Sequence, residues 1–133
     1  MLLVQPRSFR TMSKILTLSL SLIVCPCVLA ASDTSYDIAQ RAYNRSDFKE
    51  AETRFRKLAN NGNPPAQYNM GVMYTRGEGL PQDLVQAYFW FSLAAGKRYG
   101  NARQSRAAVR RTLNSTQLVE GQRLIDEWKG QRQ

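Results

Sequence analysis

The chain has 133 residues, with 19 lysines and arginines against 10 acids, two cysteines and no histidine. The absence of histidine excludes every catalytic triad and metal site that needs an imidazole. Both cysteines lie before residue 30, so residues 31–133 also have no thiol for a disulfide, a nucleophile or a zinc site.

The first 30 residues have the layout of a secretory signal peptide. Three basic residues precede an apolar run over 15–24: Arg7, Arg10 and Lys14. Val28 and Ala30 are small enough for the positions that precede a cleavage site, so we predict cleavage after Ala30. The run is shorter than the roughly 20 residues that span a bilayer. We therefore expect a signal peptide over 1–30 and a periplasmic or secreted domain over 31–133 with no transmembrane segment. The alternatives are an uncleaved anchor and a start at Met12.

The first predicted hairpin pairs a helix over about 36–44 with a helix over about 47–60. Four residues form an apolar stripe on the second of these helices: Ala51, Phe55, Leu58 and Ala59. The remaining face is polar, and we expect it to lie in water: Lys49, Glu52, Thr53, Arg54 and Arg56. We therefore predict an amphipathic helix at the edge of the fold.

The same helix is repeated 36 residues later. Four identities relate the two copies, in pairs: Asp47 and Asp83, Ala51 and Ala87, Phe55 and Phe91, Ala59 and Ala95. In both copies the aspartate precedes Glu50 or Gln86 by three positions, which is the spacing of a capping box. The other faces differ, because the second copy carries apolar residues nearly all round. We therefore expect residues 83–95 to lie at the centre of one shared core, with the first hairpin covering one flank.

A turn separates this buried helix from another helix predicted over about 65–75. Gly77 and Gly79 supply positive-φ conformations, Pro81 prevents the preceding helix from continuing, and Asp83 starts the next one. A phosphate-binding loop would need a third glycine or a following lysine, and neither is present. We interpret the segment as a turn.

A basic helix is predicted over 101–113. No acid occurs between Asp83 and Glu120, and on this helix Arg103, Arg106 and Arg110 fall on one face. Such a face suits an anionic partner, such as an acidic protein, a lipid head group or an envelope polysaccharide, and a solvated surface is the alternative. Nucleic acid is disfavoured, because no aromatic platform for bases accompanies the arginines.

The last predicted helix covers 116–129 and has an apolar stripe: Leu118, Gly121, Leu124, Ile125 and Trp128. Asn114 and Gln117 have capping spacing. We expect this helix to cover the stack with a polar outer face: Arg123, Asp126, Glu127 and Lys129. With six helical segments and no sustained alternation, the fold class is all-α, a short α-solenoid of antiparallel helix pairs with capping helices over 103–130.

Residues 66–95 resemble a Sel-one-like repeat, a relative of the tetratricopeptide repeat. The matching positions follow the family pattern in order: Ala66, Tyr68, Met70, Gly71, Tyr74, Gly77, Gly79, Leu80, Asp83, Ala87, Trp90, Ala94 and Ala95. We assign a clear repeat to 66–102 and a degenerate copy without the glycine turn to 36–65. The resemblance implies a right-handed stack of helix pairs that serves as an interaction scaffold, often in secreted bacterial regulators and adaptors, without catalytic residues.

The candidate contacts are helix positions that the predicted core does not use. On the repeats these are Gln40, Arg41, Asn44, Gln67, Asn69 and Met73, and on the basic helix Arg103, Arg106 and Arg110. Each is also explained as ordinary solvated surface. No two carboxylates converge, because Glu50 and Glu52 face different directions. We therefore predict a protein-binding module that needs no catalytic residue, cofactor or metal, with binding of an anionic ligand as the alternative.

Overall fold

The computed structural model describes residues 34–133, which lie within one compact unit over 31–133. The predicted signal peptide and its cleavage site after Ala30 lie outside the described residues. Across the described part every regular element is a helix, as the fold-class prediction requires. The bounds are α1 Ser35–Asn44, α2 Phe48–Asn60, α3 Pro64–Arg76, α4 Leu84–Gly96, α5 Ala102–Thr112 and α6 Ser115–Gly130. In this part of the chain none of the helices is long and apolar enough to cross a membrane.

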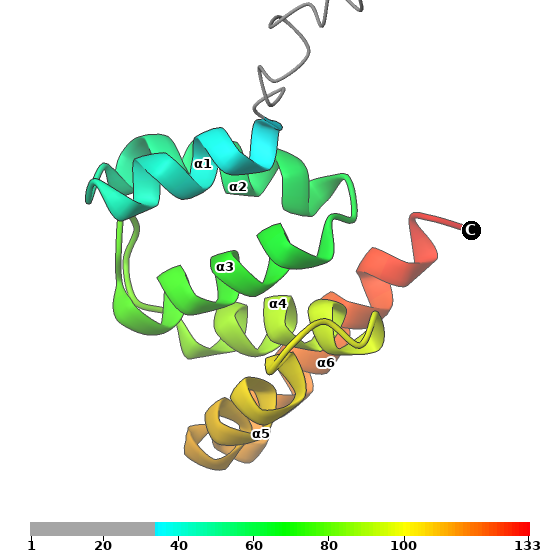
Figure 1. Ribbon diagram of the computed structural model, residues 1–133. Coiled ribbons are helices and arrows are strands. Elements are labelled where there is room, and N and C mark those ends of the chain that lie inside the picture. The colour runs from blue at the N-terminus through cyan, green and yellow to red at the C-terminus, as the bar shows by residue number, and fades with distance from the viewer. Residues whose placement is uncertain (1–33) are drawn as a thin grey trace, which may run out of the picture. The chain divides into compact units, whose positions relative to one another are not determined.

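The first four helices form two successive hairpins, α1–α2 and α3–α4, and α3 lies between the first hairpin and α4 (Figure 1). Helices α5 and α6 both pack on α4. Every helix except α5 begins where a polar side chain accepts a backbone N–H group of the first turn. The Thr34 hydroxyl caps α1 with the return bond from Asp37, and Asn114 and Gln117 form the same reciprocal pair at α6. The capping residues thus define these helix starts.

At α2 and α4 the predicted capping box is only half formed. Asp47 accepts the N–H of Glu50 at 3.3 Å, and Asp83 accepts two N–H groups of α4 at 2.9 and 3.0 Å. The return bond from the side chain three residues on is absent in both copies, because the N–H of each aspartate is already bonded to a carbonyl of the preceding helix. These carbonyls, on Ala42 and Tyr74, tie each helix start to its own hairpin.

The glycine turn does more than reverse the chain. Gly77 and Gly79 have φ of 69° and 77°, as predicted. A Cβ on Gly79 would lie 2.5 Å from the Phe48 carbonyl oxygen, so the turn lies directly against the start of α2. Tyr43 donates a hydrogen bond from its hydroxyl to Glu78 in the same turn at 2.6 Å. The turn therefore fixes the second hairpin against the first.

Helix α4 is the central helix, and none of its residues from 84 to 95 is exposed. Its backbone packs against α3, α5 and α6. Helix α3 lies between α2 and α4, so the first hairpin meets α4 through the side-chain cluster that they share and not through close backbone packing. Close packing of α3 on α4 depends on Gly71, where a Cβ would lie 2.6 Å from the Phe91 ring.

The two hairpins share one core cluster, as predicted, and α4 also contributes to a second cluster that the sequence did not predict. Phe89, Trp90 and Leu93 pack in a cluster with side chains of the first hairpin, α3 and α6. Ala87 and Phe91 pack in a second cluster with residues of α5, including Val109. A helix that is apolar all round has two faces to bury, so each face finds its own partners.

One residue on the polar side of α2 is buried, although the sequence analysis predicted that it lies in water. Glu52 is buried at 8% exposure and pairs with Arg56 four residues on. Arg56 also donates to the Tyr74 hydroxyl at 3.1 Å and lies over that ring. The pair is covered because α3 reaches this side of α2, which the spacing within one helix does not reveal.

Candidate interaction surfaces

A polar network joins the first helices of the two repeats. The Tyr36 hydroxyl donates to Gln40 Oε1 at 3.2 Å, and Gln40 Nε2 donates to Asn44 Oδ1 at 3.0 Å. From α3, Asn69 Nδ2 donates to the Tyr36 hydroxyl at 3.0 Å and to Gln40 Oε1 at 3.2 Å. We call these four residues the polar face. Because they hold one another, they lose little freedom when a partner binds.

Tyrosine rings border the polar face. Burial raises the pKa of Tyr36 above its usual value, the hydrogen bond from Asn69 opposes this rise, and the Tyr99 hydroxyl adds to it. Tyr99 comes from the link between α4 and α5, and its ring lies 5.8 Å from that of Tyr68 on α3. Partly buried tyrosines beside amide side chains are a composition typical of protein-binding surfaces.

Three of these four residues were predicted from the sequence as surface contacts. Two other residues predicted with them are not part of the polar face. Gln40, Asn44 and Asn69 lie together, and Arg41 is exposed on the same helix. The prediction that Gln67 and Met73 are surface contacts is wrong, because they are 1% and 0% exposed. Helix α2 covers that side of α3: Gln67 Nε2 donates to the Ala59 carbonyl at 3.2 Å, and Met73 packs in the cluster of the first hairpin.

The three arginines predicted as one basic face do not line a common hollow. Arg103 borders a hollow of about 200 Å³ with Arg98 and Tyr99. Arg106 is partly buried and lines a larger pocket, and Arg110 is exposed and lines neither of them. Helix α5 therefore offers no hollow in which its three arginines meet.

The sequence analysis did not predict the larger pocket. It has a volume of about 390 Å³, and we call it the basic pocket. Its walls come from α3, α4, α5, α6 and the α2–α3 link: Gly62, Gln67, Tyr88, Ser92, Leu93, Gly96, Lys97, Arg106, Gln122, Ile125, Trp128, Lys129 and Arg132. Its residues lie up to 70 positions apart in the chain, so no local motif indicates it.

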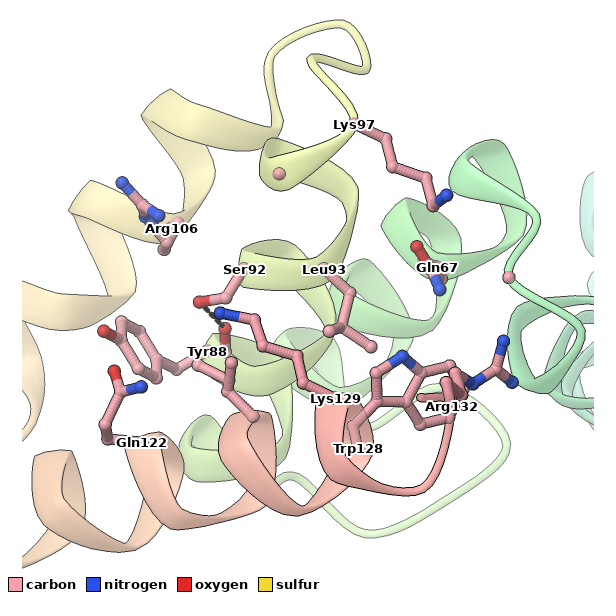
Figure 2. Close-up of a pocket in the computed structure, with 13 residues that line it drawn as sticks. Gln67, Tyr88, Ser92, Leu93, Lys97, Arg106, Gln122, Trp128, Lys129 and Arg132 are labelled. Atoms are coloured by element: carbon pink, nitrogen blue, oxygen red, sulfur yellow. Dashed lines mark hydrogen bonds between the residues drawn. The ribbon is translucent and has the colours of Figure 1, made fainter.

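The basic pocket has four cations in its walls and no carboxylate. Within residues 34–133, the side chains of Lys97, Arg106 and Lys129 make no hydrogen bond or ion pair. Arg132 is engaged, because its guanidinium stacks at 3.9 Å on the Trp128 ring and donates to the Asn60 carbonyl. Figure 2 shows Lys97 extending from the end of α4 toward Gln67, and Lys129 extending from α6 toward Ser92. The pocket thus has an uncompensated positive charge.

The acidic residues gather in no comparable way. In the described part of the chain Glu52 is the one buried carboxylate, and it is neutralised by Arg56. Glu120 and Glu127 both pair with Arg123 on the outer side of α6. The region also holds no group of three His, Cys, Asp or Glu side chains placed to bind a metal ion. The chemistry that these surfaces offer is recognition by hydrogen bonds and charge.

Successive antiparallel helix pairs, with α3 stacked between α2 and α4, define an all-α helical-repeat protein of the tetratricopeptide-like class. Within that class, the Sel1 repeat family model matches residues 64–98, which hold α3, the glycine turn and α4. The chain therefore contains a Sel1 repeat, as its resemblance predicted. Sel1 repeats generally mediate protein–protein interactions and form a non-catalytic scaffold. No curated protein matches the chain in sequence.

Proposed function

We propose that this protein is a non-catalytic adaptor or regulator that binds another protein through the polar face. The observation that carries the proposal is the hydrogen-bonded set Tyr36, Gln40, Asn44 and Asn69, which spans both repeats. A surface that is already ordered before binding spends less of its interaction energy on fixing side chains. The matched Sel1 repeat supports this reading, because its family acts by binding proteins.

We place this activity in the bacterial cell envelope, in the periplasm or outside the cell. The support is the N-terminal layout, in which basic residues, an apolar run and small residues before Ala31 follow in the order of a cleavable signal. N-terminal sequencing of the protein recovered from the envelope fraction tests this. A mature chain that begins at Ala31 is the expected result, and recovery of the uncleaved chain in the cytoplasm contradicts it.

Site-specific photo-crosslinking in the producing cells tests the binding surface. A photoreactive amino acid replaces Asn44, which is exposed at the end of the polar face, and in a matched strain it replaces Lys57, exposed on α2 of the same hairpin. We expect illumination to give a discrete protein adduct at position 44 and none at position 57. Equal labelling of both positions, or no adduct at 44, contradicts the proposal.

Binding of an anionic ligand is the second candidate function, and one observation favours it. The basic pocket gathers Lys97, Arg106 and Lys129 from three elements without a carboxylate among its lining residues. The pocket replaces the basic helix 101–113 as the place where such binding would occur. Affinity for a polyanion must fall steeply with ionic strength, so a titration at about 50 and 200 mM salt measures this contribution.

A further inference from the structure

The basic pocket combines its charge with an apolar wall. Leu93 on α4 and Ile125 on α6 are buried, and the Trp128 ring stands beside them. A volume of about 390 Å³ lies at the lower end of the roughly 300–1,000 Å³ typical of ligand pockets. An occupant must therefore bring a negative charge and a small apolar group at the same time.

Polar groups in the wall of the basic pocket restrict further which kind of occupant fits it. Gln67 is 1% exposed, and its Oε1 accepts no hydrogen bond from residues 34–133. A buried acceptor without a partner destabilises the fold, so a donor supplied at this wall is favourable. Ser92 and Gln122 add a hydroxyl and an amide. An alkyl carboxylate brings no donor for Gln67 Oε1, whereas a peptide backbone supplies N–H groups.

We propose that the basic pocket receives an acidic side chain of a protein partner together with the apolar side chain next to it in the partner's sequence. The carboxylate is attracted by the positive charge of the unpaired cations in the wall, and the apolar neighbour packs on Leu93 and Trp128. This inference rests on the proposed function as a protein-binding module. It adds a second contact surface, separate from the polar face, and states the chemistry of the partner.

Backbone amide NMR of the purified, isotope-labelled protein tests the pocket. The probe is an end-blocked pentapeptide with leucine between two aspartates. Its controls are the same peptide with asparagines and one with glycine in place of leucine. We expect the first probe to shift the resonances of Leu93, Ser92 and the Trp128 indole, and each control to bind at least about tenfold more weakly.

Matched charge reversals assign the binding to the pocket. Lys97→Glu with Lys129→Glu removes two unpaired, exposed cations of the pocket, and Lys57→Glu with Arg110→Glu makes the same charge change on exposed residues outside it. We expect the pocket variant to lose peptide binding about tenfold or more and the control variant to change it less than about twofold. If circular dichroism shows that the double reversal unfolds, Lys97→Gln with Lys129→Gln gives the same comparison.

Each remaining outcome overturns the proposal. Equal losses in both charge variants mean attraction by net charge alone, and equal shifts from inorganic phosphate mean a site for a bare anion. Octanoate that binds more tightly than the peptide means an amphiphile site instead. Failure of the proposed function can be distinguished from failure of this inference. The crosslink at position 44 reports on the polar face, whether or not the peptide binds in the basic pocket.

Discussion

Helix α2 has one side in water and helix α4 has none, although the two share an apolar stripe at a spacing of 36 residues. Phe55 and Phe91 occupy the same position in the two copies and are both buried, at 0% and 3% exposure. They lie in different clusters, however, because Phe91 faces α5 while other apolar residues of α4 join the cluster that holds Phe55. The stripe therefore fixes the pairing within a hairpin, and the opposite face decides whether a helix is terminal or central.

The largest effect that tests this comparison comes from the shared phenylalanines. Phe55→Ala and Phe91→Ala should each lower the free energy of unfolding by about 3–5 kcal/mol, as truncations of buried aromatics do. The Trp90→Ala substitution on α4 should fall in the same range, since Trp90 is 3% exposed. Urea denaturation measures all three, with Val119→Ala as control, because Val119 is 70% exposed. A loss below about 1 kcal/mol for Phe91→Ala would remove α4 from the centre of the fold.

The next test concerns the contact that makes α4 central. Gly71→Ala places a methyl group 2.6 Å from the Phe91 ring and should cost about 1–3 kcal/mol by overpacking. Gly96→Ala is the matched control, because nothing lies within 4 Å of a Cβ at that end of α4. Its stability should be unchanged or slightly raised. Equal melting curves for the two variants would show that α3 and α4 do not touch at Gly71.

The caps of the two copies give a smaller difference. Asp83 accepts two backbone N–H groups, at 2.9 and 3.0 Å, whereas Asp47 accepts one at 3.3 Å. Loss of a capping side chain costs about 0.5–2 kcal/mol, so Asp83→Ala should lie near the upper end and Asp47→Ala near the lower. Chemical denaturation of both variants against the same reference decides this. The reverse order would mean that the α2 start depends more on its cap than its geometry indicates.

Local sequence was sufficient for the fold. Helix starts follow from capping residues such as Asp47 and Asn114, the reversal follows from Gly77 and Gly79, and repeat spacing reveals the two related helices. Each of these signals acts within a few residues of the feature it determines. The predictions that failed concern neighbours. Periodicity shows that Glu52 points away from the stripe of α2, but it does not show that α3 covers it.

The candidate surfaces divide in the same way. Gln40, Asn44 and Asn69 were found because they lie off the apolar stripes of their own helices, and their role in binding stays a prediction. Gln67 was misplaced for the reason that misplaced Glu52, since α2 closes over its side of α3. The basic pocket is assembled from five segments, and its cations are only individually visible in the sequence. The absence of acids between Asp83 and Glu120 was the one signal pointing toward it.

The smallest expected effect is a pH dependence of stability that comes from tyrosines of the first hairpin and not from α4. Burial raises the pKa of Tyr36 and of Tyr43, and the bond from Tyr43 to Glu78 raises the latter further. A folded pKa above the unfolded value near 10 gives stability that is complete below pH 10 and is lost as the pH rises through the folded pKa. Tyr36→Phe and Tyr43→Phe should therefore each flatten the decline in melting temperature above about pH 10.

Asp37 supplies the control with the opposite sign, on the same helix as both tyrosines. Hydrogen bonds from the Thr34 hydroxyl and backbone N–H lower its pKa, so its contribution is present above its unfolded value and is lost as the pH falls through the folded one. Asp37→Asn should flatten the acid limb of the melting curve and leave the alkaline limb unchanged. If Asp37→Asn and Tyr36→Phe alter the same limb of the melting curve, the pH dependence of stability does not arise from these α1 groups.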